Sequence, residues 1–104
     1  MQLGTRRNRT RMEIVADILQ VAVPGARKTH IMYGANLSFE QLEKYLKFLL
    51  RRGLLGNEAG KGEYKTTKTG TSYLREFKEY HKYQETFEEK KQLLEQILEG
   101  YEAG

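Results

Sequence analysis

Apolar residues recur at helical spacing in the first part of the chain, and three short helices are predicted there. The first covers residues 12–23, and Pro24-Gly25 is expected to end it. Thr10 with Glu13 three residues later has the residue types of a capping box. The apolar face of this helix consists of Val15, Ile18, Leu19 and Ala22.

A second helix is predicted over residues 28–34, and a third opens at Ser38, with Gln41 at the capping-box position and Gly53 as the C-cap. Gly34-Ala35-Asn36 lies between them and supplies the small residues that a tight turn between two crossing helices needs. The pattern therefore predicts a helix-turn-helix. Phe39, Leu42, Leu46 and Leu49 share one face of the third helix.

After Gly53 the pattern becomes extended. Residues 54–58 and 63–67 flank a four-residue, glycine-containing loop, which predicts a β-hairpin. Three helices followed by a hairpin is the order of a winged helix. The expected fold class is thus mainly α with a small β-hairpin, followed by one long C-terminal helix.

The C-terminal helix is expected to start at a cap formed by Thr69 or Thr71 and to end near Leu98. A helix of about 28 residues is about 42 Å long, too long for the preceding residues to cover. Polar Gln84 and Lys91 interrupt its apolar stripe, as register-setting residues do in coiled coils. The stripe, which predicts a coiled-coil dimer interface, follows strict 4-3 spacing through Tyr73, Phe77, Tyr80, Gln84, Phe87, Lys91, Leu94, Leu98 and Tyr101.

Charge divides the chain in two. Residues 1–70 contain 13 Lys and Arg against 6 Asp and Glu, whereas residues 71–104 contain 5 against 8. A basic body with a net charge of +7 precedes a tail of −3, consistent with a total of +4 and a pI of 9.3, and such a body favours a polyanionic partner. We expect a flexible basic arm over residues 1–9, a winged-helix DNA-binding domain over 10–70 and a dimerisation helix over 71–101.

Several functional classes have little support in the sequence. Without cysteine there is no disulfide framework or thiolate metal site, and no apolar run approaches the roughly 20 residues that cross a membrane. His30 and His81 are far apart and lack partners at metal-ligand spacing. We therefore expect no enzyme activity, metal, cofactor, small-molecule ligand or membrane association, and a cytoplasmic, nucleoid-associated location.

The third helix carries the best candidate site. With its leucines toward the core, Gln41, Lys44, Lys47, Phe48 and Arg51 point outward. Donors near the start of a helix and cations along its flank suit base edges and phosphates in a major groove. Glu40 and Glu43 oppose this, and an ordinary solvated face is the alternative. Arg51-Arg52 also suits the negative end of the helix dipole, an effect of about 0.3 to 1 kcal/mol that is compatible with phosphate contact.

Basic residues elsewhere extend this surface. Lys61 and Lys65 lie at the hairpin, where they suit a wing against a phosphate backbone or simply an exposed loop. The arginine-rich N-terminal arm, with Arg6, Arg7, Arg9 and Arg11, suits a minor groove or a solubilising tail. The candidate DNA-contacting residues are Arg27, Lys28, Thr29, Ser38, Gln41, Lys44, Lys47, Arg51, Lys61 and Lys65.

The stretch KTHIMYGANLSFEQLEKYLKFLLRRGLL, residues 28–55, resembles the winged-helix core of the 10a-type archaeal DNA-binding proteins and the related archaeal winged-helix transcriptional regulators. The resemblance extends from Met12 into the last helix. It implies a homodimer joined by an antiparallel coiled coil that binds double-stranded DNA with little or modest sequence preference. The matching positions are Lys28, Thr29, Ile31, Met32, Tyr33, Ala35, Asn36, Leu37, Ser38, Tyr45, Leu46, Gly53 and Leu54.

Two functions are consistent with these observations. The first is a dimeric DNA-binding protein that acts as a transcriptional regulator or as an architectural chromatin protein. The alternative is a winged-helix module for protein-protein interaction without direct DNA binding, which Glu40 and Glu43 favour.

Overall fold

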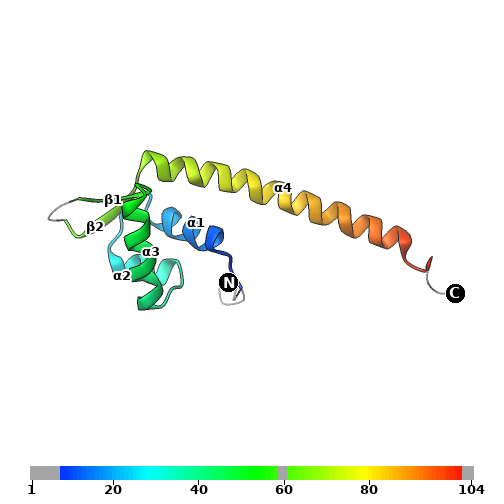
Figure 1. Cartoon of the computed structure of the whole chain (residues 1–104), viewed down its shortest axis with the longest axis horizontal. Coiled ribbons are helices and arrows are strands. Elements are labelled where there is room, and N and C mark those ends of the chain that lie inside the picture. Colours follow the sequence, from blue (N-terminus) through cyan, green and yellow to red (C-terminus); the bar gives the residue numbers. More distant parts are fainter. Residues whose placement is uncertain (1–7, 59–60, 102–104) are drawn as a thin grey trace.

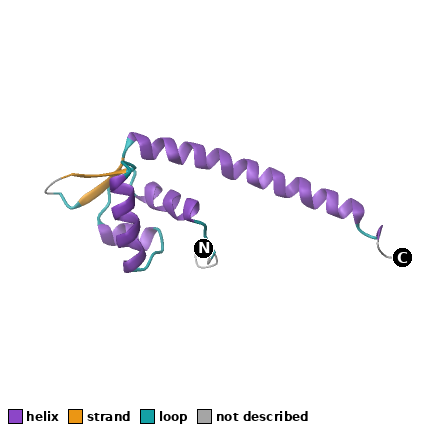
Figure 2. Cartoon of the chain, in the orientation of Figure 1, coloured by secondary structure: helices purple, strands orange, loops and turns teal. Residues whose placement is uncertain are grey.

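The computed structural model describes residues 8–58 and 61–101 of the chain. A bundle of three helices and a hairpin forms a body from which one long helix projects (Figures 1 and 2). This arrangement confirms the fold class predicted from the sequence. The elements are α1 (Arg11–Val21), α2 (Lys28–Gly34), α3 (Phe39–Arg51), β1 (Leu55–Glu58), β2 (Glu63–Thr66) and α4 (Lys68–Leu98).

Both predicted capping boxes are present. In α1 the Thr10 hydroxyl accepts a hydrogen bond from the Glu13 amide at 3.2 Å, and the Glu13 carboxylate accepts one from the Thr10 amide at 2.9 Å. Ser38 and Gln41 repeat the arrangement at the start of α3, with both distances at 3.1 Å. Caps of this kind stabilise a helix by about 1 kcal/mol each, because they satisfy amides that have no partner within the helix.

The end of α3 differs slightly from the prediction. Arg52 is the C-cap, and Gly53 is the following residue, with φ of +75°. The Gly53 amide donates to the Leu50 carbonyl at 3.1 Å, and the Leu54 amide donates to the Leu49 carbonyl at 2.9 Å. This pair of bonds is a Schellman motif, which places its glycine one position after the cap because the left-handed conformation falls there.

The turn between α2 and α3 depends on three residues with different roles. Asn36 is the residue with positive φ, at +54°. Ala35 is buried, and a Cβ atom on Gly34 would lie 2.9 Å from a methyl group of Val21 in α1. Gly34 is therefore needed for close packing of α2 on α1, whereas the tight reversal of the chain occurs at Asn36.

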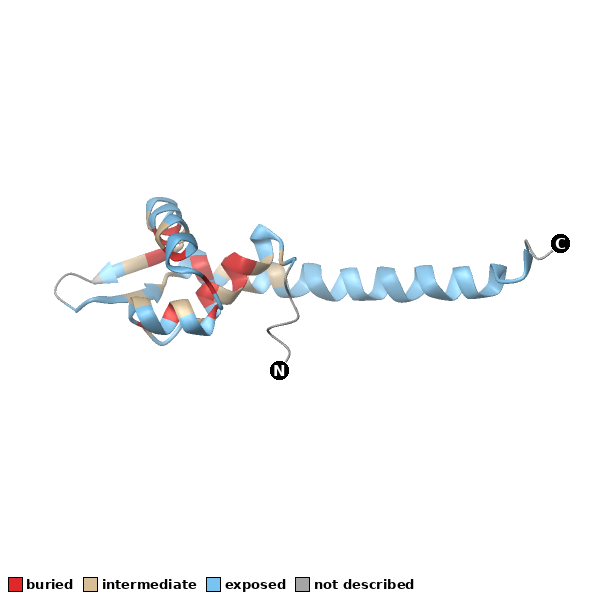
Figure 3. Ribbon diagram, turned by 90° about the horizontal axis from the view of Figure 1, so that it is seen from below, coloured by how far each residue is buried: buried red, intermediate tan, exposed pale blue. Residues whose placement is uncertain are grey.

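The core lies where α1, α2, α3 and the base of the hairpin meet, and the buried residues are confined to this body and the first turns of α4 (Figure 3). Complete burial of one large aliphatic side chain stabilises the folded state by about 1.5 to 3 kcal/mol. The largest fully buried side chains are Ile18, Leu19, Ile31, Leu42 and Leu49.

The hairpin is anchored to the helices at its base. β1 and β2 pair antiparallel, with Leu55 opposite Thr66. Ala26, just before α2, forms a further antiparallel bridge with Tyr64, with amide-to-carbonyl distances of 2.8 and 2.9 Å. The Thr66 hydroxyl donates to the Leu19 carbonyl of α1 at 2.6 Å. These contacts connect three segments that are distant in sequence, so the hairpin is continuous with the body.

The cap of α4 was predicted at the wrong residue. Thr67, rather than Thr69 or Thr71, is the N-cap, and its hydroxyl accepts from the Gly70 amide at 3.1 Å. The same hydroxyl lies 2.6 Å from the Gly53 carbonyl, to which it donates. A contact with a residue distant in sequence thus makes Thr67 the N-cap. As a result α4 begins at Lys68, three residues before the predicted boundary at residue 71.

Beyond its first turns α4 leaves the body. Tyr73 and Leu74 pack against the core cluster, and Phe77 is half-buried, but every residue from Lys78 to Leu98 is exposed. The chain accordingly measures 70 Å along its longest axis and 25 by 22 Å across. In the part of the chain that the structure describes, no helix has both the length and the apolar character to span a membrane.

Candidate nucleic-acid interface

The outer surface of α3 carries the predicted cations. Lys44, Lys47 and Arg51 are all exposed, and none of them forms an ion pair with another described residue. Gln41 is exposed in the first turn, and its side-chain oxygen is occupied by the capping box. Its amide group keeps two donors, and the Ser38 hydroxyl keeps one. The start of α3 can therefore donate hydrogen bonds, and its flank carries positive charge.

Lys28 does not belong to this free cationic surface. Its ammonium group lies 2.7 Å from a carboxylate oxygen of Glu43 and 5.9 Å from the centre of the Phe39 ring. The hydrogen bond with Glu43 raises the pKa of Lys28 above its usual 10.5. The pair connects α2 to α3 and neutralises one of the two carboxylates that oppose DNA binding on α3.

The remaining candidates lie on α2 and on the hairpin. Arg27 precedes α2, where its side chain makes no capping bond, and Thr29 is exposed in the first turn. A Cβ atom on Gly62 would lie 3.2 Å from Arg27 Nη1, so the Arg27 guanidinium reaches the hairpin. Lys61 and Lys65 are exposed. The hairpin projects from the body on the side opposite the free end of α4 (Figure 1).

Arg9 contradicts the prediction of a flexible arm over residues 1–9. Its guanidinium lies 2.6 Å from an Asp17 carboxylate oxygen and donates to the carbonyls of Ala35 and Asn36 at 2.8 and 2.9 Å. Only 10% of its side chain is exposed. Arg9 therefore joins α1 to the turn between α2 and α3. Arg6 and Arg7 lie outside the described residues.

Only part of the stripe predicted from Tyr73 to Tyr101 is free to pair with a second helix. The Tyr73 hydroxyl donates to the Met12 carbonyl at 2.9 Å, and burial raises the pKa of Tyr73. Phe77 stacks between Tyr73 and His81, with ring centres 6.3 and 6.1 Å apart. At the other end α4 stops at Leu98, and Gly100 has φ of +92°, so Tyr101 does not continue the helical spacing. The first two residues of the stripe serve the body, and the last lies beyond the helix.

The two histidines lie on different helices. His30 is exposed on α2, and His81 lies 3.3 Å from Glu85 one turn further along α4. Among the residues that the structure describes, no three His, Cys, Asp or Glu side chains gather where they could hold a metal ion.

Comparisons with known proteins agree with this geometry. A family model described as winged helix-turn-helix matches residues 8–85, which is more than half of the chain. The chain belongs to the winged helix-turn-helix family. In the terms of this family α2 and α3 form the helix-turn-helix, and the hairpin is the wing.

Two similar proteins come from archaea. This winged helix has a TM-score of 0.80 and 28% identity to the crystal structure of Sso10a-2, a DNA-binding protein from Sulfolobus solfataricus, with 86% of this chain and 97% of that one covered. An uncharacterized protein of Methanocaldococcus jannaschii is 33% identical over 66 residues, covering 62% of this chain and 66% of that protein. The predicted resemblance to the 10a-type proteins is confirmed.

Sequence reasoning missed three features of this winged helix. These are the Arg9 contacts, the bridge from Ala26 to Tyr64 and the hydrogen bond from Tyr73 to Met12. Apart from the contact of Arg9 with Asp17, each joins residues at least 26 positions apart. Neither periodicity nor capping signals report contacts over such distances. DNA contact by the candidate residues stays a prediction.

Proposed function

We propose that this protein binds double-stranded DNA, with α3 in the major groove and the wing beside the neighbouring phosphates. The observation that carries the proposal is the exposed, unpaired set of Lys44, Lys47 and Arg51 on the outer surface of α3. The winged-helix family and the likeness to a DNA-binding archaeal protein support the same function. Because Lys28 neutralises Glu43, only Glu40 of the two carboxylates still favours the alternative of a pure protein-interaction module.

Charge reversal on α3 tests the proposal. Replacing Lys47→Glu together with Arg51→Glu should weaken duplex binding and reduce the slope of log K against log salt by about 0.9 for each phosphate that the variant no longer neutralises. Lys78→Glu with Lys82→Glu makes the same change of charge on the exposed part of α4. It is the control once sedimentation shows that it has the same oligomeric state as wild type. Fluorescence anisotropy at several salt concentrations measures both quantities. Equal affinities and slopes for the two variants would disprove recognition through α3.

We further propose that α4 pairs with α4 of a second copy. Tyr73 and Phe77 serve the body. Of the seven large exposed apolar residues of α4, five form a stripe with regular 3-4 spacing that is interrupted only by Lys90, and Leu93 and Leu98 lie outside it. This stripe, rotated from the predicted one, contains Tyr80, Tyr83, Phe87, Leu94 and Ile97. Such a large uncovered apolar surface favours association.

The charges of α4 support an antiparallel pair. Residues 68–82 carry four Lys and Arg against two Glu, a net charge of +2, whereas residues 83–101 carry two Lys against five Glu, a net charge of −3. A parallel pair would place like charges together, and an antiparallel pair places the basic half of one helix beside the acidic half of the other. In that pair Tyr80 can lie opposite Ile97, Tyr83 opposite Leu94 and Phe87 opposite Lys90, so that aromatic rings meet smaller or flexible side chains.

The dimer is tested by sedimentation equilibrium at micromolar concentration. Wild type should be dimeric, and Phe87→Asp with Leu94→Asp should be monomeric, because two charges would enter the apolar stripe. Tyr33→Asp is the control, since Tyr33 is a well exposed aromatic residue on α2. A monomeric wild type, or an α4 variant that stays fully dimeric, would contradict the pairing.

Antiparallel pairing favours an architectural role over operator recognition. The 31 residues of α4 extend about 46 Å at 1.5 Å per residue, and the two bodies would lie at opposite ends of the pair. Adjacent half-sites on DNA are about 34 to 36 Å apart. A dimer of this length suits bridging of two duplexes or contacts at widely separated positions on one.

A further inference from the structure

A groove lies between α1, α3 and the start of α4. It has a volume of about 560 Å³ and a bed that is mainly apolar. Arg11 and Lys44 contribute positive charge to its lining. Its remaining lining residues are Met12, Val15, Gln41, Tyr45, Phe48 and Tyr73. None of the described residues that line it is acidic, so its chemistry suits an apolar segment that carries negative charge.

The end of α4 has this chemistry. Leu98 is exposed and lies outside the rotated stripe, as does Tyr101, which is 84% exposed. Glu95 lies three residues before Leu98, so the two side chains are neighbours on the helix surface. Pairing through the stripe alone would therefore leave an apolar and acidic segment at the end of each helix without a partner.

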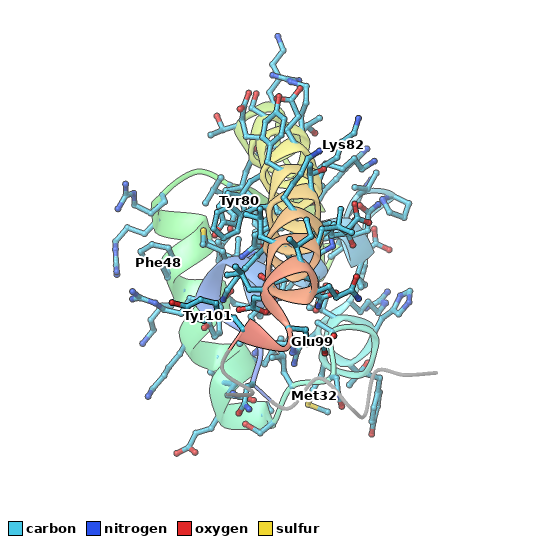
Figure 4. The ribbon with its side chains drawn as sticks, turned by 90° about the vertical axis from the view of Figure 1, so that its right-hand side faces the viewer. Met32, Phe48, Tyr80, Lys82, Glu99 and Tyr101 are labelled. Atoms are coloured by element: carbon cyan, nitrogen blue, oxygen red, sulfur yellow. The ribbon has the colours of Figure 1, made fainter. Side chains whose placement is uncertain are left out.

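The proposed pairing brings this segment to the groove. If Tyr80 lies opposite Ile97, then Leu98 of the partner subunit lies opposite Glu79, six residues from the Tyr73 that lines the groove. Tyr101 of the partner subunit follows just beyond the end of that helix. Seen along α4 from its free end, Tyr80 and Tyr101 project toward the side on which Phe48 and α3 lie, whereas Lys82 projects away from that side (Figure 4). A second helix on the stripe would thus end beside α3.

We propose that the groove of each body holds the end of α4 from the partner subunit. Leu98 and Tyr101 lie on the apolar bed beside Phe48, and Glu95 approaches Arg11 and Lys44. This inference rests on the proposed antiparallel dimer and goes beyond it. Each DNA-binding body is then completed by two chains, and Lys44 serves the contact between subunits, which leaves Lys47 and Arg51 for DNA.

Cross-linking between single-cysteine variants tests the docking, because the natural chain has no cysteine. Phe48→Cys protein is mixed with Tyr101→Cys protein and treated with a short bismaleimide. Because each molecule has a single cysteine, any cross-link joins two separate molecules. Tyr33→Cys mixed with Tyr101→Cys is the matched control, since Tyr33 is an exposed aromatic residue outside the groove. Thermal melts verify that each variant folds, and sedimentation reports the dimer independently.

The outcomes separate the docking from the dimer. A dimer that cross-links through positions 48 and 101, several-fold more than through 33 and 101, supports docking. A dimer with no such preference overturns the docking and leaves the pairing intact. Efficient cross-linking of Tyr101→Cys to itself indicates parallel helices and overturns the docking. A monomeric wild type overturns both proposals.

Discussion

Arg9 offers a sharp test of how the N-terminal segment functions. Arg9→Ala removes an ion pair with Asp17 and two hydrogen bonds to the carbonyls of Ala35 and Asn36. Removal of a hydrogen bond that involves a charged group usually costs about 1.5 to 3 kcal/mol. Water can replace part of this stabilisation, since Asp17 is 30% exposed and the bond to Asn36 is at the surface.

The expected cost is therefore about 2 kcal/mol, between the values of about 0 to 1 for exposed pairs and 3 to 5 for broken buried pairs. For a domain of 60 to 100 residues this lowers the Tm by roughly 8 to 16 °C. Arg9→Lys should recover only part of the stability, because an ammonium group cannot reproduce the fork of three contacts.

Thermal and urea unfolding followed by circular dichroism measure the effect, at one protein concentration because dimerisation changes the Tm. Gln20→Ala is the control, as Gln20 is an exposed residue of α1 that does not line the groove. We expect Arg9→Ala to be clearly less stable than Gln20→Ala and to keep the wild-type salt slope for DNA binding. If both variants keep wild-type stability and only DNA binding falls, Arg9 belongs to a DNA-binding arm.

Three further predictions concern the junction, the pH response and the N-terminus. Gly70→Ala should lower the free energy of unfolding by about 2 kcal/mol or more, despite a helix-propensity gain of about 1 kcal/mol, because its Cβ atom would lie 2.4 Å from the Leu54 carbonyl oxygen. Gly56→Ala is the control and should be nearly neutral, because its Cβ atom meets only ordinary contacts. Urea unfolding measures both. Burial raises the pKa of Tyr73 above 10.0, so its neutral form is favoured in the folded state, and the stability present below pH 10 is lost as pH rises through the raised value. Thermal melts above pH 10 should thus decline more steeply for wild type than for Tyr73→Phe, and equal declines would contradict this. Deletion of residues 1–7 should lower the DNA salt slope by at most about 1.8, or 0.9 for each of its two arginines; a larger fall would implicate other groups.

The sequence was most informative where structure depends on neighbouring residues. The capping boxes at Thr10 and Ser38 and the bounds of α2 are all confirmed. Each depends on groups within a few positions of one another, so residue types at fixed spacing are sufficient to predict them. The rotation of α3 follows for the same reason, since a stripe of leucines determines which side faces outward.

Predictions failed where a distant contact decides between local alternatives. Thr67, Thr69 and Thr71 are equivalent as sequence signals, and the carbonyl of Gly53 selects Thr67. Tyr73 and Tyr80 belong to one apolar pattern, yet Tyr73 packs on its own body and Tyr80 remains exposed. Likewise, a run of arginines does not reveal that Arg9 has a carboxylate and two carbonyls within reach.

The buried glycine at the start of α4 also has a mechanical consequence. Gly70 lets the helix backbone approach the Leu54 carbonyl more closely than any side chain would permit. This junction, together with the packing of Tyr73 and Leu74 on the core, sets the direction of α4. Because the helix is about 46 Å long, it acts as a lever, and a tilt of about 5° at this junction moves its free end by about 4 Å. A small change in the packing around a single glycine would thus alter the distance and relative orientation of two duplexes held by a dimer.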